Sequence, residues 1–260
     1  MINLIVFVND EKTNLRKTLL SILLQSVLKE VNVLIVYKNV ELQENFNNVV
    51  SLFLDKLNIE NLIISDFDIL NKIYSNSKYL MIMKDNEFFY DAFSIENLLK
   101  SFVEETDNDF VYSNLVTINN TTYENVDNYY SSVSGKLFNL NFFRQYNLNL
   151  LELIESEFVF MSKCFLYSKN NYFVDSIVLI VEEEKDLILD VINEYIVDTI
   201  FVYNELVGKV TDEKIKEYIN WVFCYLCDLR QKWIKYISLS EFGKIIYPLE
   251  SIYRNLFNEV

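Results

Sequence analysis

The stretch from Tyr79 to Phe89, YLMIMKDNEFF, holds residues that could do chemistry. Five apolar residues are followed at once by Lys84, Asp85, Asn86 and Glu87, and then by two aromatic residues. A short apolar run that ends in charge predicts a buried strand with polar side chains at its carboxyl end. Open α/β sheets bind ligands at that edge, so this stretch predicts a ligand site.

Composition narrows the classes of protein and partner. With 260 residues, 51% of them hydrophobic, the chain can form one main α/β domain with a helical tail. The formal charge of -15 argues against nucleic acid and against an anionic membrane surface. No run approaches the ~20 apolar residues of a membrane span, and the apolar run at residues 2–8 is too short for a signal peptide. We therefore expect a soluble, cytoplasmic protein.

The three cysteines predict neither a disulfide framework nor a metal site. Cys224 and Cys227 form a C-x-x-C, but it lies within a helical pattern, and the chain has no histidine. A zinc site would need further ligands that the sequence lacks. With Cys164 the chain has three cysteines in all, and we expect Cys224 and Cys227 to pack in the core and no metal to bind.

Hydrophobic periodicity predicts alternating strands and helices through most of the chain. Apolar runs that do not alternate predict strands buried on both faces, and their spacing implies right-handed parallel crossovers. Strands are expected at residues 2–8, 31–36, 62–64, 79–83, 109–116 and 172–181, the last without an assigned partner. Helices are expected at residues 12–26, 41–57, 69–74, 94–104 and 152–167, and a tyrosine-rich loop or irregular strands at 119–132. The sequence thus predicts an α/β fold.

From residue 183 onward the pattern is helical, so we predict an α/β domain at 1–182 and a helical extension at 183–260. Gly208 is expected to end one helix and Asp212 to cap the next. Aromatic residues exceed what one helix face usually needs, which predicts a docking surface for a protein partner or for self-association. They are Trp221, Phe223, Tyr225, Trp233 and Tyr236.

The order of these segments resembles the family 2 glycosyltransferases of the GT-A fold. INLIVFVNDEKTNLRKTLLSILLQS is similar to that family's first strand, turn and helix, and VNVLIVYKN to its second strand. LNKIYSNSKYLMIMKDNEFF resembles the segment that carries the metal-binding Asp-x-Asp. SGKLFNLNFFRQYNL, ESEFVFMSKCF and YFVDSIVLIVEEE resemble the segments that follow, as far as about residue 184. The resemblance implies a GT-A fold, with a mostly parallel sheet flanked by helices, and a nucleotide-sugar donor.

The resemblance also implies where a metal ion would bind. In such enzymes the Asp-x-Asp holds a cation that neutralises the departing diphosphate. The alignment places Lys84 and Asn86 at the two aspartates, with Asp85 between them. A shift of one residue would offer Asp85 or Glu87 instead, although strand alternation would turn Asp85 away from the site. Glycines that would let the backbone approach a diphosphate are also missing before Tyr79.

Other positions of the implied donor site lie in the first two strand-end turns. Asn9 and Asp10 match the family's first turn, whereas Tyr37 and Lys38 stand where the resemblance expects aspartates on the uridine side. Lys38 and Lys84 could bind the diphosphate directly as point charges, or Lys38 could be an ordinary surface lysine.

The resemblance places Glu157 at the catalytic aspartate and Ser156 at the preceding glutamate. An inverting transferase needs a carboxylate to take the proton from the acceptor hydroxyl. Glu157 keeps that chemistry with a side chain one methylene longer. It is equally explained as an acidic residue in the first turn of a helix, which the helix dipole favours.

Two functions follow from these residues. The first is a glycosyltransferase-like protein with a degenerate donor site, which acts as a non-catalytic binding or assembly component and needs no cofactor. The alternative is an active, metal-independent, inverting glycosyltransferase that moves a sugar from a nucleotide-sugar donor to a glycan or protein acceptor. In that case Lys38 and Lys84 bind the diphosphate and Glu157 is the base. A divalent metal is expected only if the protein is an active enzyme that uses the metal-dependent mechanism implied by the resemblance.

Overall fold

The computed structural model describes residues 1–64, 77–104, 108–119, 122–126, 132–182, 188–232 and 238–257. The predicted helix at residues 69–74 lies outside these ranges, as do parts of the tyrosine-rich stretch at 119–132.

The chain forms two compact units, and each unit is built from two separate segments. The first unit, an α/β unit, comprises residues 1–147 and 168–183, and the second, a helical unit, comprises residues 148–167 and 184–260. Residues 148–167, which the sequence assigns to the α/β domain, thus group with the C-terminal helices. The other predicted boundary, after residue 182, lies one residue from where the chain passes into the helical unit.

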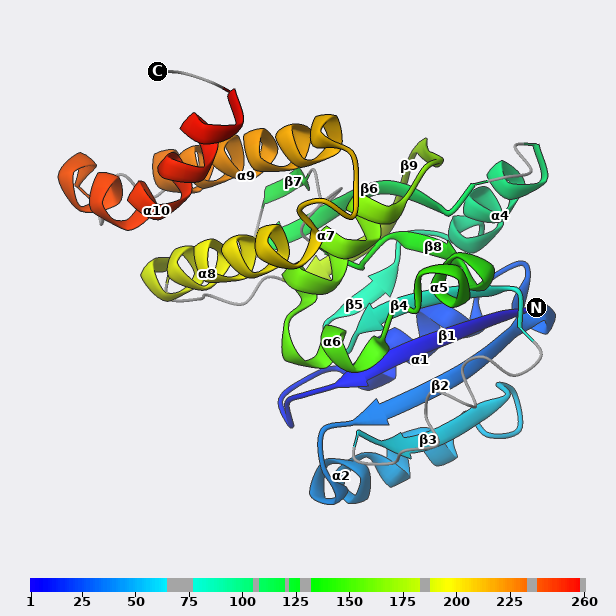
Figure 1. The fold of residues 1–260 in the computed structure, drawn as a ribbon. Helices are drawn as coiled ribbons and strands as arrows, with labels where there is room; N and C mark the ends of the chain where they lie inside the picture. Colours follow the sequence, from blue (N-terminus) through cyan, green and yellow to red (C-terminus); the bar gives the residue numbers. More distant parts are fainter. Residues whose placement is uncertain are drawn as a thin grey trace. The chain divides into compact units, whose positions relative to one another are not determined.

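The α/β unit contains one curled sheet with helices (Figure 1). Its described strands are β1 (Ile2–Val8), β2 (Val31–Tyr37), β3 (Ile59–Ile63), β4 (Tyr79–Lys84), β5 (Glu87–Phe89), β6 (Phe110–Asn119), β7 (Thr122–Val126), β8 (Lys136–Asn139) and β9 (Asn171–Glu182). Its described helices are α1 (Leu15–Leu23), the 3-10 helix η1 (Leu28–Glu30), α2 (Val40–Ser51), α4 (Ser94–Glu104) and α5 (Leu140–Tyr146).

The strand order is β3-β2-β1-β4-β8-β6-β9-β5, and β7 pairs with β6. Strands β3, β2, β1 and β4 are parallel, as predicted. Strand β8 lies antiparallel between β4 and β6. Strand β9, which had no predicted partner, runs parallel to β6 and antiparallel to β5.

Asparagine side chains set where the first two helices begin. The Asn14 side chain accepts a hydrogen bond from the Lys17 amide, so α1 begins at Leu15 rather than near residue 12. Asn39 does the same for α2, accepting from the Leu42 amide at 2.9 Å. Such caps satisfy amides that the first helical turn leaves without partners.

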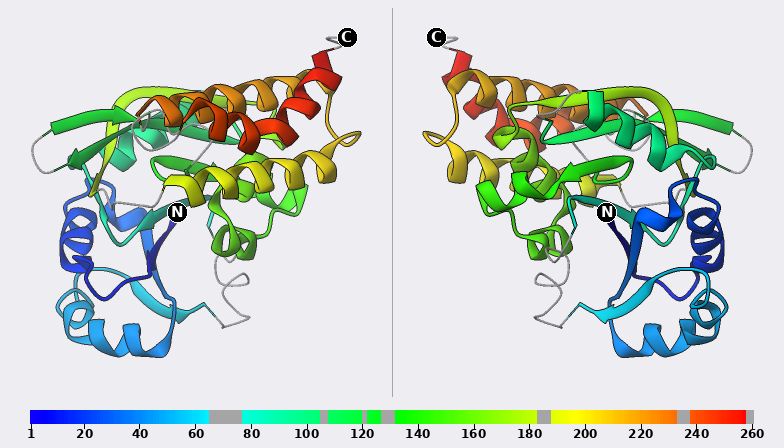
Figure 2. Two further views of the ribbon diagram at one scale, coloured as in Figure 1. Left: turned by 90° about the vertical axis from the view of Figure 1, so that its left-hand side faces the viewer. Right: turned by 90° about the vertical axis from the view of Figure 1, so that its right-hand side faces the viewer.

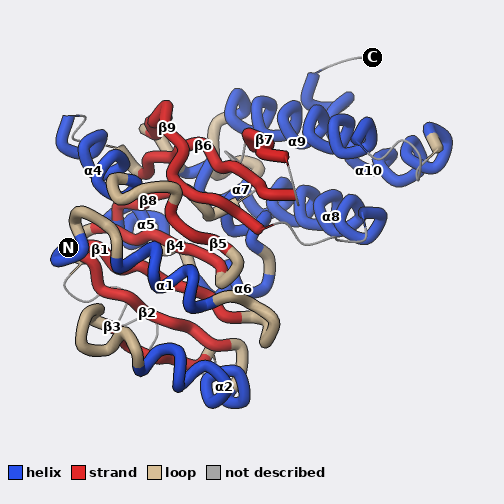
Figure 3. The backbone as a smooth tube through the Cα atoms, turned by 180° about the vertical axis from the view of Figure 1, so that it is seen from behind, coloured by secondary structure: helices blue, strands red, loops and turns tan. Residues whose placement is uncertain are grey.

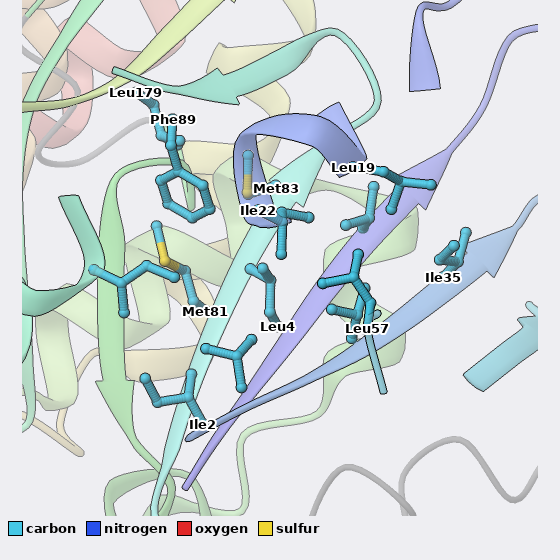
Figure 4. Packing of buried hydrophobic residues seen from close by; sticks show 14 of the residues in the cluster. Ile2, Leu4, Leu19, Ile22, Ile35, Leu57, Met81, Met83, Phe89 and Leu179 are labelled. Atoms are coloured by element: carbon cyan, nitrogen blue, oxygen red, sulfur yellow. The ribbon is translucent and has the colours of Figure 1, made fainter. Parts of the chain in front are cut away.

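One hydrophobic core joins the sheet to α1, α2 and α4 in the α/β unit. Figure 3 shows α1 and α2 lying along the strands β1, β2 and β3. In Figure 4, Leu4, Met81 and Leu19 converge from two strands and a helix, and all three are fully buried. The register of β1, β2 and β4 brings their carboxyl ends level: Val8 pairs with Tyr37, and Phe7 with Lys84.

The helical unit consists of α6 (Leu150–Glu155), α7 (Glu157–Tyr167), α8 (Ile188–Leu206), α9 (Asp212–Lys232) and α10 (Leu239–Phe257). Figure 2 shows α8, α9 and α10 lying side by side. The single helix predicted at residues 152–167 is two helices. Ser156 has extended backbone (φ -154°, ψ 112°), and its hydroxyl accepts from the Val159 amide, so α6 ends there and α7 begins.

Gly208 follows the end of α8 with φ +80°, as expected for a helix stop. The cap of α9 is one residue earlier than predicted. The Thr211 hydroxyl accepts from the Lys214 amide at 3.4 Å, so Asp212 is the first helical residue.

Contacts of α7 explain why residues 148–167 belong to the helical unit. The Phe158 ring lies 4.5 Å from Tyr195 on α8 and 6.2 Å from Trp221 on α9. The buried Tyr218 hydroxyl donates to Ser162 Oγ at 2.9 Å. These aromatic and polar contacts come from side chains far apart in the sequence, and they fasten α7 to both later helices.

The aromatic residues of α9 are used in packing within the helical unit. The Trp221 and Tyr225 rings stack at 5.1 Å, and Phe223 lies 5.4 Å from Tyr253 on α10. Trp233 and Tyr236 lie outside the described residues. Among the described helices, none is both long and apolar enough to cross a membrane.

Candidate functional site

The parallel strands β1, β2 and β4 end at one edge of the sheet, because Phe7 is level with Lys84 and Val8 with Tyr37. The six residues predicted on the donor side all lie at this edge. They are Asn9 and Asp10 after β1, Lys38 after β2, and Lys84, Asp85 and Asn86 at the end of β4.

The Asp85 carboxylate joins two of these strand ends. Its side chain is buried, and Oδ2 accepts from the backbone amide of Asn9 at 2.7 Å and from that of Asp10 at 3.4 Å. The Thr18 hydroxyl of α1 donates to the Asp85 carbonyl at 3.1 Å. Asp85 therefore fixes the turn after β1, and its carboxylate is engaged by protein donors.

Glu87 is a second buried carboxylate, only 2% exposed. Its Oε2 accepts from the Lys84 amide at 3.0 Å and its Oε1 from the Ser134 hydroxyl. The same segment carries Lys136, which is fully buried and donates from Nζ to the Ser132 carbonyl. This group fastens the end of β4 to residues 132–136. Sequence reasoning treated Glu87 as a possible ligand and missed its bond to Ser134, because no local pattern links residues 87 and 134.

Asn86 is tied to the end of β9. Its Nδ2 donates to the Glu182 carbonyl at 2.8 Å, and the Glu182 amide donates to the Asn86 carbonyl at 3.0 Å. The Asn86 Oδ1 atom is buried and has no hydrogen-bond partner within the described part of the chain. Beside it, Lys17 pairs with the Glu182 carboxylate and lies 3.6 Å from the centre of the Phe88 ring.

Tyr37 and Lys38 have different environments at the end of β2. The Tyr37 side chain is fully buried and its hydroxyl donates to Asn61 Oδ1 at 3.2 Å. Burial raises the pKa of Tyr37 to about 12, so it is a neutral phenol at physiological pH. Lys38 is exposed, and its backbone amide donates to the Val8 carbonyl. Of the two, only Lys38 is open to a ligand in solution.

Glu157 lies on the helical unit, whereas the six edge residues lie on the α/β unit. It is the first residue of α7 and is half-buried. Just before it, the Ser156 hydroxyl donates to Asp198 Oδ2 at 2.6 Å. Asp198, on α8, is a carboxylate near the start of α7 that sequence reasoning missed, because no local pattern links residues 156 and 198.

A divalent cation such as Mg²⁺ or Ca²⁺ is held by several oxygen ligands. Throughout the described ranges, no group of three or more His, Cys, Asp or Glu residues could hold a metal ion. At the strand edge, Asn86 Oδ1 is neutral and buried, and the exposed Asp10 carboxylate accepts from the Lys12 amide through Oδ1. The cationic side chain of Lys84 is two residues before Asn86.

Comparisons with known proteins identify the fold. No protein-family model and no curated protein matches the sequence. Among solved structures, S. aureus TarS 1-349 in complex with UDP-GlcNAc matches with a TM-score of 0.67 at 11% identity, covering 98% of this chain and 79% of that chain. Its complex with UDP matches with a TM-score of 0.64 at 14% identity, over 94% and 78%. The fold is that of the GT-A-like glycosyltransferases.

A second similar structure is a mannosyltransferase, PcManGT from Pyrobaculum calidifontis, in complex with GDP-Man and Mn²⁺. It matches with a TM-score of 0.53 at 10% identity, covering 99% of this chain and 88% of that chain. These matches confirm the predicted GT-A-like α/β fold. At such identities the likeness is one of fold, so activity must be argued from this chain's own residues.

Proposed function

We propose that this is a glycosyltransferase-like protein with a degenerate donor site, which acts as a non-catalytic binding or assembly component. One observation carries the proposal. Asp85 and Glu87, the two carboxylates at the end of β4, are both buried and bonded to protein N–H and O–H groups.

A metal-assisted transferase needs carboxylates that can turn to a cation. If Asp85 bound a metal through Oδ2, it would leave the Asn9 and Asp10 amides without this acceptor. If Glu87 turned to a metal, the Ser134 hydroxyl and the Lys84 amide would lose theirs. A buried donor without an acceptor, as the Ser134 hydroxyl would be, costs about 1–3 kcal/mol, whereas the exposed Asn9 and Asp10 amides would lose a charged acceptor but could bond to water. The residues present therefore do not fit a divalent metal, and we assign no cofactor.

A second candidate is an active, metal-independent inverting glycosyltransferase. It is favoured by Lys38 and Lys84, which end the two strands on either side of β1. Two strand spacings separate their backbones by about 10 Å, a distance that two lysine side chains can bridge around a diphosphate. In this reading Glu157 takes the proton from a glycan or protein acceptor.

Donor turnover and donor binding separate the two candidates. We would incubate the full chain with UDP-GlcNAc or GDP-mannose, with and without Mn²⁺, and measure released nucleoside diphosphate. Calorimetry would measure binding of UDP and GDP. We expect no turnover above that of buffer, because the described residues contain no group of three side chains that could hold a metal and the carboxylates of Asp85 and Glu87 are bonded to the protein.

Three other outcomes would decide between the two candidate functions. Turnover that Glu157→Gln abolishes would overturn the non-catalytic proposal and support the second candidate. Binding that is lost in Lys38→Ala/Lys84→Ala, but kept in the matched surface pair Lys29→Ala/Lys56→Ala, would assign the lysines to the diphosphate. The absence of any nucleotide binding would exclude the second candidate.

A further inference from the structure

Helix α8 carries a stripe of side chains that is apolar in the middle and acidic at both ends. Val197 is 64% exposed and Phe201 is 55% exposed. They lie one turn apart on the same face of the helix. Glu194 precedes Val197 by three residues, and Glu205 follows Phe201 by four. We call Glu194, Val197, Phe201 and Glu205 the α8 stripe.

A buried lysine links the α8 stripe to α6. Lys163 Nζ lies 2.7 Å from Glu205 Oε2, 3.1 Å from Glu152 Oε1 and 5.6 Å from the centre of the Phe201 ring. Glu152 of α6 therefore lies close to the C-terminal end of the stripe. Two neighbours of Glu152 on α6 are also exposed apolar residues: Leu151 at 39% and Ile154 at 38%.

The helices around the stripe are strongly acidic. Within the bounds of α6, α7 and α8 there are seven carboxylates and one ammonium group, a balance of -6. The acidic residues are Glu152, Glu155, Glu157, Asp190, Glu194, Asp198 and Glu205, and the basic residue is Lys163. Because Lys163 is 7% exposed and paired with two of these carboxylates, it adds little positive charge to the surface.

We infer that the α8 stripe binds a basic amphipathic helix of a protein partner. Adjacent large apolar side chains that remain in water indicate an interaction site. A complementary helix would place apolar side chains over Val197 and Phe201, and Lys or Arg side chains one turn away over Glu194 and Glu205. This inference rests on the proposed binding or assembly role and names the class of partner.

The charge of the surface decides against other occupants. Nucleic acid and anionic lipid would bring negative charge to a negative surface. A second copy of this chain would bring the same carboxylates to face themselves, which costs energy at an interface. The aromatic residues described on α9 do not form a rival surface, since Trp221, Phe223 and Tyr225 contact other rings of the helical unit.

The test is a titration of a designed, fluorescein-labelled helical peptide with the full chain. The probe has leucines at i and i+4 with lysines one turn before and after them. The control peptide keeps the leucines and carries glutamates in place of the lysines. Fluorescence anisotropy should show binding of the lysine peptide below about 100 µM and weakening between about 0.05 and 0.5 M salt.

Matched variants locate the binding. Phe201→Ala should weaken the lysine peptide at least about tenfold, as expected for a central apolar anchor. Tyr247→Ala on α10 removes another exposed aromatic side chain, 68% exposed, and should change affinity by less than about twofold. Glu194→Gln should weaken binding more than Glu44→Gln, an exposed glutamate on α2. Val197→Ser gives a second variant of the stripe should Phe201→Ala fail to fold.

Several results would overturn the inference: equal affinity for both peptides, no binding of the lysine peptide, or equal effects of the Phe201 and Tyr247 variants. A dimer in light scattering that Val197→Ser or Phe201→Ala dissociates would assign the stripe to self-association instead. Turnover of a nucleotide sugar together with peptide binding would overturn the proposed function and keep the stripe. Failure of the peptide in a protein without turnover would overturn only the stripe.

Discussion

The end of β4 and the helices around α7 both contain buried charge, but they differ in whether the carboxylates are buried. At β4 the carboxylates of Asp85 and Glu87 are themselves buried, and they accept hydrogen bonds from backbone amides and from the Ser134 hydroxyl. Around α7 the buried group is the ammonium of Lys163, and two carboxylates face it that remain 31% and 34% exposed.

The difference lies in which group keeps contact with water. A carboxylate that is buried among protein donors shapes the backbone and is withheld from ligands. A carboxylate that is one-third exposed still contributes its negative field to the surface. In our proposal the carboxylates at the end of β4 therefore serve the fold rather than a cation, whereas the helical unit offers a negative surface to a basic partner.

The largest loss of stability is expected for a substitution at the end of β4. Asp85→Ala should lower the free energy of unfolding by about 2–4 kcal/mol, because the Asn9 and Asp10 amides lose a charged acceptor that is itself buried. Urea denaturation followed by circular dichroism would measure this. The control Asp55→Ala, at an exposed position, should stay within about 0.5 kcal/mol. A loss no larger than that of the control would mean that the Asp85 carboxylate does not hold the turn.

A smaller effect is expected at Lys163. Burial lowers its pKa, but hydrogen bonds to Glu205 and Glu152 outweigh burial, so the pKa is raised overall. The stabilisation is thus fully present below the unfolded lysine pKa and is lost as pH rises through the folded value. At pH 7, Lys163→Met should cost about 1–3 kcal/mol, since two carboxylates then lack their cation. Adding Glu205→Gln should restore part of this loss, and an additive double variant would contradict the pairing.

Tyr37 should make the smallest contribution to stability of the three residues, and this contribution depends on pH. Burial raises its pKa in the folded protein to about 12, above the value of about 10 for an unperturbed tyrosine, so its contribution to stability is full below pH 10 and is lost as pH rises toward 12. By pH 11 the protein should lose about 1 kcal/mol of stability through this group. The Tyr37→Phe variant should not lose this part of its stability between pH 10 and pH 11. Identical pH profiles for the two proteins would show that Tyr37 is not buried as described.

The sequence predicts an element of the α/β unit well where the limits of that element are marked by its own residues. Strands β1, β2 and β4 are apolar on both faces and end in polar residues, so their limits are visible in the sequence. The pairing of β9 with β6, and the attachment of α7 to α8 and α9, join residues far apart along the chain. Periodicity describes which face of an element is apolar and not which other element covers it.

At the candidate site, too, some features could be predicted from the sequence and others depend on contacts between residues far apart along the chain. Topology alone brings the six strand-end residues to one edge, and the sequence predicts that grouping. The alternation rule turned Asp85 away from the site, but Asp85 lies in the turn between β4 and β5, where extended backbone has ended and the rule no longer applies. The bonds from Asn9 and Asp10 depend on that turn, so they could not be predicted.

The chain passes from one unit to the other three times, and this order has a consequence during synthesis. Helix α7, whose residues 158–166 are all buried in the finished protein, is synthesised before α8 and α9. At about 5–20 residues per second, the stretch from 168 to 232 takes several seconds to make. The helical unit therefore cannot be completed until several seconds after its first two helices have been made.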